Sequence, residues 1–394
     1  MKSKQKQDKK SFSKWILIFV VIFIVIYIFC SRILGVSLTG NGTVLREDKQ
    51  IISLNIKENS YIGLNGKQII KVNRDGIIAY DLDGYEIWSD TFTAINYIVK
   101  QREPYIAVGT KEGKQISLFN TKGKVTEIVC DYPIIYFSVN ESGGISVIQS
   151  LDGGHMVAGY NAQGQYLGGM VTYTDMEGYP TNVELSPNNE ILIATYIKTD
   201  EPVLTSSIRA IHMQKTSAEE GQGVKYGITA KEDFIYEVEF IKDNVWLSIG
   251  DKKITWYDID GNEIASKMNI TSIYRPYLTK RSSYGAGFFP IISSENATSN
   301  IIQRKDKLTY WNARGEESFV TDLPSATDYL YIDARGVVIG SDNQFIGYNK
   351  IGSETFSYKS SVDVSKVFYL SEIRKGIAVT KEGIILLTPT GKVA

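Results

Sequence analysis

The stretch DGIIAYDLDGYEIWS, residues 75 to 89, decides the fold of this 394-residue chain. An apolar run, IIAY, is followed by DLDG and by a second apolar run that ends at Trp88. An Asp at the start of a four-residue connection accepts hydrogen bonds from the backbone that follows, and a Gly at its end takes a positive φ. The stretch therefore predicts a tight β-hairpin.

The same pattern recurs along the chain. Its copies are IIAY-DLDG-YEIW (77–88), ISLF-NTKG-KVTEIV (116–129), MVAGY-NAQG-QYLGGM (156–170), ITWY-DIDG-NEIA (254–265), LTYW-NARG-EESFV (308–320), FIGY-NKIG-SETFS (345–357) and IILL-TPTG-KVA (384–394). The gap of 97 residues between Gly164 and Gly261 is about two periods. VELSPNNEILIATY (183–196) and SSIRAIHM (206–213) fill it as one more copy, with a long turn at QKTSAEEGQG. The sequence thus contains eight units.

A repeat near 40 residues with four short strands is the period of WD40-like and related β-propellers. The run Ile77 to Tyr80 is apolar at every position, which indicates a strand covered on both faces, as in sheets that stack radially. We therefore predict an all-β chain, a β-propeller of eight blades with seven as the alternative. A set of β-sandwich domains is the competing architecture.

The two ends of the chain predict how the ring closes. The last unit stops at Ala394, too soon after its turn for an outer strand, whereas DKQIISLNIK (48–57) is a lone strand-like run before the first unit. We expect residues 50–56 to supply the outer strand of the last blade, which would remove a free edge.

The N-terminus predicts a membrane anchor. Six lysines and one aspartate precede an uncharged apolar run from Trp15 to Cys30, and a helix over 15–36 would be about 33 Å long, enough to span the bilayer. Lysines before the span predict a cytoplasmic N-terminus. The expected parts are a basic cytoplasmic tail (1–14), a transmembrane signal-anchor helix (15–36), a short linker (37–49) and an extracytoplasmic propeller (50–394). The expected location is the cell membrane.

Cysteine and charge usage fit an exported body. A cleaved signal peptide would have a cleavage site of small residues, such as A-x-A, and none is visible here. Lipoprotein processing at Cys30 would need small residues before the cysteine, where Tyr27, Ile28 and Phe29 are bulky. Cys130 is the other cysteine, so a disulfide framework is excluded, as is usual in Gram-positive surface proteins. Removing the basic tail and Arg32 from the net charge of −1 leaves −7 for residues 36–394, which disfavours nucleic acid as a partner.

Two resemblances support this interpretation. DGIIAYDLDGYEIWS resembles the quinoprotein-like propeller repeat, with Trp88 in the expected place, although the other turns lack that tryptophan. ATYIKTDEPVLTSSIRAIHM (194–213) and FIYEVEFIKDNVWLSIGDKKITWYDIDG (234–261), with the basic tail and single span, resemble an uncharacterised family of membrane-anchored propeller proteins from Gram-positive anaerobes. The second resemblance covers nearly the whole chain; it implies fold and topology and no catalytic residues.

Common catalytic and metal motifs do not fit. DLDG (81–84) and DIDG (258–261) have their glycine at the fourth position, whereas a calcium-binding EF-hand needs it at the sixth. His155 and His212 are the only histidines, which disfavours a zinc site or a His-dependent triad. Quinone-dependent relatives of the repeat have a vicinal Cys pair, which this chain lacks. We expect no metal and no other cofactor.

A lengthened repeat at 270–300 supplies the candidate binding residues. It gathers aromatic and basic side chains, which are typical of protein-interface hot spots. They are Tyr274, Arg275, Tyr277, Arg281, Tyr284, Phe288 and Phe289. The alternative is ordinary inner strands joined by a long loop. TYTDMEGYPTN (172–182) is a second loop of similar kind with a weaker signal.

These observations predict a non-enzymatic scaffold or recognition module at the cell envelope, whose partner is a protein or an envelope polymer. The alternative is an enzyme acting on envelope polysaccharide or a related substrate, with two carboxylates about 5 to 10 Å apart at the propeller channel. A transmembrane sensor is disfavoured because the tail has no room for a domain.

Overall fold

The computed structural model describes residues 42–55, 58–199, 203–213, 223–268, 289–294, 306–323, 326–333 and 335–390. These residues form 31 strands, β1 to β31. In this part of the chain, no helix has the length and apolar character needed to cross a membrane. The predicted anchor at 15–36 lies outside the described residues.

Five sheets are four-stranded antiparallel meanders of consecutive strands. The first contains β2 (Tyr61–Asn65), β3 (Gln68–Asn73), β4 (Gly76–Tyr80) and β5 (Glu86–Thr91). The second contains β6 (Tyr97–Arg102), β7 (Tyr105–Thr110), β8 (Gln115–Asn120) and β9 (Gly123–Val129). The third contains β10 (Ile134–Val139), β11 (Ile145–Leu151), β12 (Gly154–Tyr160) and β13 (Tyr166–Tyr173). The fourth contains β14 (Tyr179–Leu185), β15 (Ile191–Lys198), β16 (Thr205–His212) and β17 (Val224–Lys231). The fifth contains β18 (Ile235–Lys242), β19 (Val245–Gly250), β20 (Lys253–Asp258) and β21 (Glu263–Met268).

Two further sheets complete the described strands. The smaller contains β22 (Phe289–Ser294), β23 (Asp306–Trp311) and β24 (Glu317–Asp322). The larger has eight strands in the order β25 (Tyr329–Asp333), β26 (Gly336–Ser341), β27 (Gln344–Asn349), β28 (Glu354–Lys359), β1 (Thr43–Ser53), β31 (Gly383–Pro389), β30 (Lys375–Thr380) and β29 (Val364–Leu370). It therefore consists of two meanders joined through β1.

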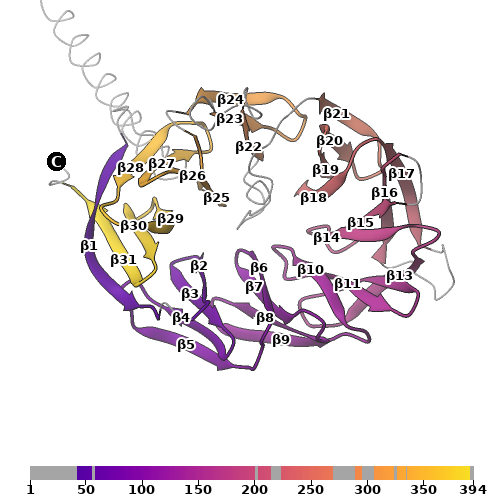
Figure 1. Ribbon diagram of the computed structural model, residues 1–394, viewed down its shortest axis with the longest axis horizontal. Coiled ribbons are helices and arrows are strands. Elements are labelled where there is room, and N and C mark those ends of the chain that lie inside the picture. The colour runs from indigo at the N-terminus through magenta and orange to yellow at the C-terminus, as the bar shows by residue number, and fades with distance from the viewer. Residues whose placement is uncertain are drawn as a thin grey trace, which may run out of the picture.

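The sheets follow one another around a ring (Figure 1). The first strand of each four-stranded meander, such as β6, β10 or β14, lies nearest the centre, and the last, such as β9, β13 or β17, lies on the outside. This is the architecture of a β-propeller, and it confirms the all-β propeller fold predicted from the repeats.

Strand β1 closes the ring, as the chain ends predicted. It pairs antiparallel with β31 from Leu45 opposite Pro389 to Ser53 opposite Gly383. It begins at Thr43, earlier than the predicted residue 50, and its first residues also pair in parallel with β28. The closing strand therefore ties two meanders together, a contact that the sequence pattern did not indicate.

The repeated turns have the predicted chemistry. Oδ1 of Asp81 accepts hydrogen bonds from the backbone N–H of Asp83 and of Tyr85, each at 2.9 Å, and Gly84 has a φ of +90°. Asn161, Asp258, Asn312 and Asn349 accept the equivalent pairs of backbone bonds. The carboxylate of Asp81 or Asp258 thus orders a hairpin. The copy inferred for 183–213 is also present, because β15 pairs with β16 and β16 pairs with β17.

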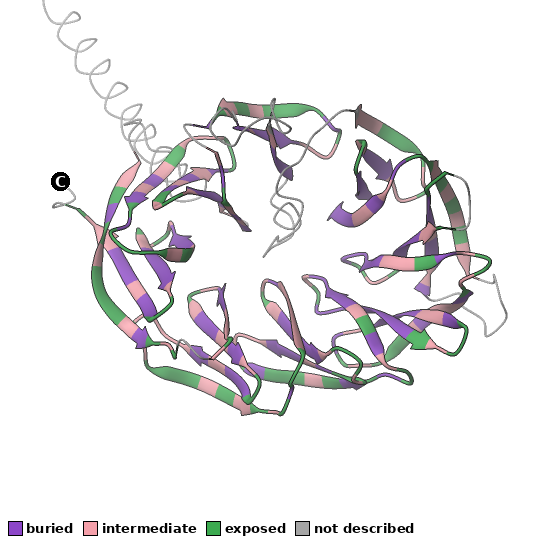
Figure 2. Ribbon diagram, viewed as in Figure 1, coloured by how far each residue is buried: buried purple, intermediate pink, exposed green. Residues whose placement is uncertain are grey.

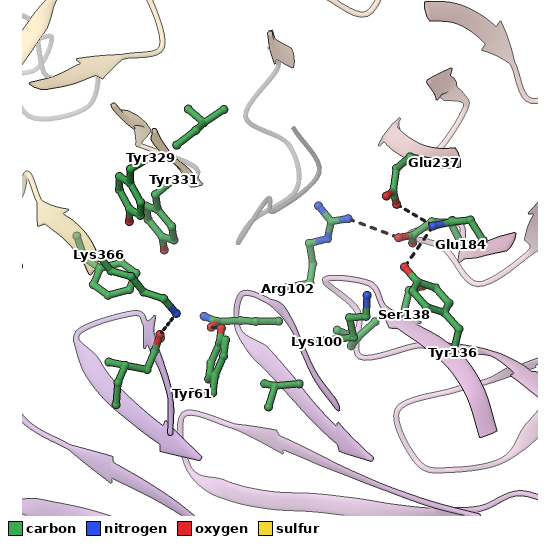
Figure 3. Close-up of a pocket in the computed structure, with 18 of the residues that line it drawn as sticks. Tyr61, Lys100, Arg102, Tyr136, Ser138, Glu184, Glu237, Tyr329, Tyr331 and Lys366 are labelled. Carbon is green, nitrogen blue, oxygen red and sulfur yellow. Dashed lines mark hydrogen bonds and ion pairs between the residues drawn. The ribbon is translucent and has the colours of Figure 1, made fainter. Parts of the chain in front are cut away.

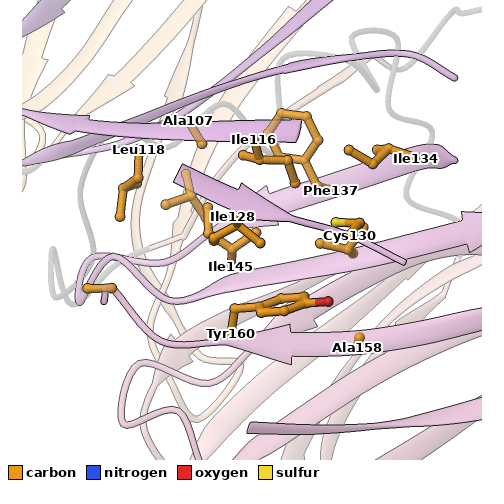
Figure 4. Packing of buried hydrophobic residues seen from close by; sticks show 13 residues of the cluster. Ala107, Ile116, Leu118, Ile128, Cys130, Ile134, Phe137, Ile145, Ala158 and Tyr160 are labelled. Carbon is orange, nitrogen blue, oxygen red and sulfur yellow. The ribbon is translucent and has the colours of Figure 1, made fainter. Parts of the chain in front are cut away.

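Apolar residues on both faces of the inner strands are buried between neighbouring sheets. Figure 2 shows burial concentrated in the inner strands and exposure on the outer ones. Figure 4 shows one such layer, in which Phe137, Ile145 and Tyr160 of one sheet meet Ile116 and Leu118 of the preceding sheet. Burial on both faces explains why the runs before the turns do not alternate.

Candidate functional site

A pocket of about 490 Å³ lies at the centre of the ring. Its walls come from the inner strands β2, β6, β10, β14, β18, β25 and β29 and from Asp328, just before β25 (Figure 3). Among the described residues, five tyrosines line it: Tyr61, Tyr136, Tyr236, Tyr329 and Tyr331. Its charged lining residues are Lys100, Arg102, Lys366, Glu184, Glu237 and Asp328. Pockets of this size accommodate small-molecule ligands.

Strand alternation explains why these side chains converge. Successive residues of a strand point to opposite faces, so residues two apart share a face. The polar side chains of the inner strands come in such pairs: Lys100 and Arg102 on β6, Tyr136 and Ser138 on β10, Asn182 and Glu184 on β14, and Glu237 and Glu239 on β18. Glu239 lies behind the pocket wall and contacts Arg102.

Arg102 joins three inner strands through a buried ionic cluster. Its Nη1 lies 2.8 Å from Oε1 of Glu239 and its Nη2 lies 4.0 Å from Oε1 of Glu184. All three side chains are at most 9% exposed. Burial disfavours the charged guanidinium, but Glu239 and Glu184 outweigh this and raise the pKa of Arg102. The cluster therefore keeps a fixed positive charge at the pocket wall.

Glu184 has an unusual protonation state for a carboxyl group. Burial raises its pKa to about 8 although Arg102 acts in the opposite direction, and the negative charge of Glu239 adds to the rise. The carboxyl group is therefore largely protonated at neutral pH, and Glu239 is the main counter-charge of Arg102.

Asn182 connects Glu237 to Tyr136. Its Nδ2 donates to Oε1 of Glu237 at 2.9 Å and to Oη of Tyr136 at 3.2 Å. The ammonium group of Lys100 lies 4.1 Å from the centroid of the Tyr136 ring, within cation–π distance. This wall thus combines a carboxylate, an amide, a phenol and an ammonium group.

The opposite wall is held by a second set of contacts. Oη of Tyr61 donates to Oε1 of Gln101 at 2.8 Å, and Nε2 of Gln101 donates to the carbonyl of Leu64 at 2.5 Å. Nζ of Lys366 donates to the carbonyl of Ile62 at 2.7 Å and lies 4.6 Å from the centroid of the Tyr61 ring. Both walls are therefore ordered by side chains from neighbouring inner strands.

Of the candidate binding residues of the sequence, the structure describes Phe289, which is not among the residues that line this pocket. Tyr274, Arg275, Tyr277, Arg281, Tyr284 and Phe288 lie outside the described residues. Phe289 is fully buried on β22, packed in one apolar cluster with Trp256 and Trp311, so it is a core residue. The pocket residues themselves were missed, although polar residues two apart in otherwise apolar runs, such as Asn182 and Glu184, were a usable signal.

The second loop, 172–182, does present exposed apolar side chains. Tyr173, Met176 and Tyr179 are 40%, 63% and 51% exposed. The ring of Tyr179 packs edge-on against His155, with 5.9 Å between the centroids. His155 and His212 are strand residues, on β12 and β16. Among the described residues, no group of three or more His, Cys, Asp or Glu side chains could hold a metal ion.

Comparison with known proteins gives a family. Residues 43–387 match the profile described as "Family of unknown function (DUF5711)". The chain belongs to this family. The match begins at the first residue of the closing strand β1 and ends within β31, so it spans the whole described ring. In sequence, the chain matches no curated protein.

Three solved structures that are similar to this DUF5711 protein are distant from it in sequence. BamB from Moraxella catarrhalis is 11% identical, with a TM-score of 0.46 over 87% of this chain and 99% of that one. Hsv2 of Kluyveromyces lactis is 11% identical, with a TM-score of 0.42 over 77% and 98%. Hydrazine synthase of Kuenenia stuttgartiensis is 10% identical, with a TM-score of 0.41 over 90% and 99%. These likenesses concern the fold alone.

Proposed function

We propose that this DUF5711 protein is a membrane-tethered, extracytoplasmic β-propeller of eight blades that recognises a component of the cell envelope without catalysing a reaction. The blade number is supported by the eight sequence units and by the described strands. Five meanders, the sheet of β22 to β24 and the two halves of the eight-stranded sheet would each be one blade.

The central pocket is the observation that carries the recognition role. Its side chains come from seven inner strands and include aromatic faces, hydrogen-bond donors and acceptors, and charges of both signs. Ligand sites combine a concave, largely preformed surface with a few convergent polar groups of this kind. A pocket with these properties is suited to bind a small polar molecule or the end of an envelope polymer.

The tether is supported by the apolar run from Trp15 to Cys30 and by the lysines before it. Strand β1 begins on the face of the ring where Leu45 pairs with Pro389. It ends on the opposite face, where Ser53 pairs with Gly383. Blades of a propeller are related by rotation about its axis, so equivalent loops lie on the same face. The loop 172–182 connects the outer strand β13 to the inner strand β14, just as the segment after β1 leads to β2. It therefore lies on the face at which β1 ends. On this topology, Tyr173, Met176 and Tyr179 would face away from the bilayer, where a protein partner could reach them.

Native mass spectrometry tests the pocket without a chosen ligand. Full-length protein, purified from its own membranes in mild detergent, is incubated with a small-molecule extract of the envelope. We expect a discrete added mass on the wild type and at least a tenfold lower occupancy in the Tyr329→Leu/Lys366→Met variant. The Tyr85→Ala variant, altered at a 74% exposed side chain of an outer turn, is the matched control. An added mass that persists equally in all three proteins would contradict recognition at the pocket.

An enzyme acting on envelope polysaccharide is the second candidate. The observation that favours it is the pair of pocket carboxyl groups, Glu184 and Glu237, of which Glu184 has a pKa of about 8, a property required of a general acid. Release of reducing ends from purified envelope glycan would support this candidate if Glu184→Gln and Glu237→Gln each abolished it. Absence of any release by the wild type would contradict it.

A further inference from the structure

A pull on the N-terminal part of the chain reaches the ring through β1. The strand begins at Thr43, on the face where Leu45 pairs with Pro389, and crosses to the opposite face. On the proposed topology, the membrane would pull at the beginning of β1, and an envelope component bound in the ring or on its far face would hold the ring back. The load would then act along the strand.

The pairing of β1 with β31 is suited to a load in this direction. Hydrogen bonds between antiparallel strands are perpendicular to the strands, so a pull along β1 loads all of them together, whereas a pull across the pair breaks them one after another. The pairing runs along the strand with two register shifts. Further bonds close it at both ends: the N–H of Thr390 donates to the carbonyl of Val44, and the N–H of Leu54 donates to the carbonyl of Glu382, each at 2.8 Å.

The end of β1 at which the pull would act is held by a second meander. Residues 43–45 pair in parallel with β28. Oε1 of Glu47 accepts hydrogen bonds from Oη of Tyr358 at 2.9 Å and from Oγ of Ser360 at 3.3 Å, on β28 and just after it. Closing the ring requires only the pairing with β31. The contacts with β28 therefore do something more, because they keep the loaded end of the strand from peeling away.

The other end of β1 lies against the first meander. Figure 1 shows β1 running along the outside of the ring, from β28 past β31 toward β5. The carbonyl oxygen of Ile51 lies beside the turn at Gly84, where an added Cβ would come within 2.2 Å of it. Ile52 packs in one apolar cluster with Ile62 and Leu64 of β2. The strand thus contacts three neighbouring meanders and would distribute a load among them.

We infer that the protein carries tension between the membrane and the envelope component that it binds, with β1 as the load-bearing strand. This rests on the proposed tether and recognition function. A strand held in this way should resist a pull along its axis and yield to a pull across it. Unfolding under force is governed by the unfolding rate, so the lifetime of the folded ring at constant force measures the difference.

Magnetic tweezers on the full-length protein in detergent test the inference without a ligand. One handle is attached at the N-terminus. For a pull along β1, the second handle is joined to a peptide tag inserted between Asp152 and Gly153, in an exposed turn beside the loop 172–182 on the far face. For a pull across the pair, the second handle is attached at the C-terminus, which follows the end of β31 that pairs with the beginning of β1. At the same force, we expect the ring to last about tenfold longer or more in the first arrangement.

A variant tests the contacts at the loaded end. Glu47→Ala should shorten the lifetime in the first arrangement by about threefold or more, because it removes the hydrogen bonds from Tyr358 and Ser360. Asp48→Ala, at the neighbouring exposed side chain, is the matched control and should leave the lifetime unchanged. Equal wild-type lifetimes in the two arrangements would overturn the inference, and this comparison holds even if Glu47→Ala fails to fold.

The outcomes separate this inference from the proposed function. Equal lifetimes together with a discrete added mass in native mass spectrometry would mean that the protein recognises an envelope component and is not built to carry tension. A longer lifetime along β1 without any added mass would contradict the recognition function and support the load-bearing role of β1.

Discussion

Nη1 of Arg102 lies 2.8 Å from Oε1 of Glu239, although the two residues are 137 positions apart in the chain. Arg102 ends the inner strand β6, and Glu239 lies on the inner strand β18. The ring brings them together because the first strand of every meander faces the same centre. A single buried contact thus spans the pocket wall and depends on correct assembly of the sheets between the two strands.

Removing Arg102 should destabilise the fold. Arg102→Ala would remove the guanidinium group that pairs with the buried carboxyl group of Glu239, and breaking a buried pair from one side costs about 3–5 kcal/mol. The matched control is Lys124→Ala, which removes surface ion pairs with Glu127 and Asp90. The three side chains are 41%, 39% and 29% exposed, so stability should change by about 1 kcal/mol or less. Urea denaturation followed by tryptophan fluorescence measures both. A similar small change in the two variants would contradict a structural role for the buried cluster.

Stability should fall as the pH rises through neutrality. The pKa of Glu184 is about 8 in the folded protein and has its ordinary value of 4.5 in the unfolded chain, so between these values the folded state holds a proton that the unfolded state has lost. The contribution of Glu184 to the free energy of unfolding is complete below pH 4.5. It decreases by about 1.4 kcal/mol per pH unit above that pH and is lost near pH 8.

Glu184→Gln should remove that part of the pH dependence, because its side chain is neutral at every pH. Burial also raises the pKa of Glu141, to about 7, with the same sign, so the wild type and the variant share that contribution. Urea denaturation at pH 5, 6, 7 and 8 gives the difference in slope. Parallel curves for the two proteins would show that Glu184 is ionised in the folded state.

Polar substitutions in the closing strand β1 should destabilise the fold at its buried positions and be tolerated at the exposed positions between them. Leu45 is 3% exposed and packs with Phe356 and Val367, whereas the neighbouring Val44 is 54% exposed. Leu45→Asp would bury an unpaired carboxylate and should cost about 3–5 kcal/mol, whereas Val44→Asp should remain within about 0.5 kcal/mol. Thermal unfolding followed by circular dichroism compares them. Equal tolerance of both substitutions would mean that β1 does not close the ring.

The first turn should not accept a side chain at Gly84. Its φ is +90°, and an added Cβ would lie 2.2 Å from the carbonyl oxygen of Ile51 on β1. Gly153, with a φ of +73° and no atom within 4 Å of an added Cβ, is the matched control. Gly153→Ala should cost about 1–2 kcal/mol from backbone strain alone, and Gly84→Ala should cost more because β1 must also move. Chemical denaturation measures the free energy of unfolding of the two variants. Equal losses for Gly84→Ala and Gly153→Ala would argue against contact between this turn and β1.

The propeller could be predicted from the sequence because its signals are local. Asp81, Gly84 and their equivalents act within one turn. The apolar run from Ile77 to Tyr80 is also a local signal, with Ile77 and Ala79 buried on one face and Ile78 and Tyr80 half-buried on the other. Closure by the N-terminal strand was also predictable, since the last unit lacks an outer strand. The parallel pairing of β1 with β28 was not, because it depends on how two neighbouring meanders are placed in space.

The pocket could not be predicted in the same way. Arg102, Glu184 and Glu237 are ordinary charged residues in their own segments, and they become a site only when three inner strands face one centre. Clusters of aromatic and basic residues such as those at 270–300 are locally conspicuous, yet Phe289 serves the core. Polar residues two apart in the first strand of each unit are the pattern that would have identified the pocket.

Hydrogen–deuterium exchange of the full-length protein, with and without a small-molecule extract of the cell envelope, tests recognition at the centre of the ring most directly. The account predicts slower exchange in the inner strands β6, β10, β14 and β18 when the extract is present, with the outer strands β5, β9 and β13 unchanged. Unchanged exchange in the inner strands, or slowing confined to the outer strands, would contradict it.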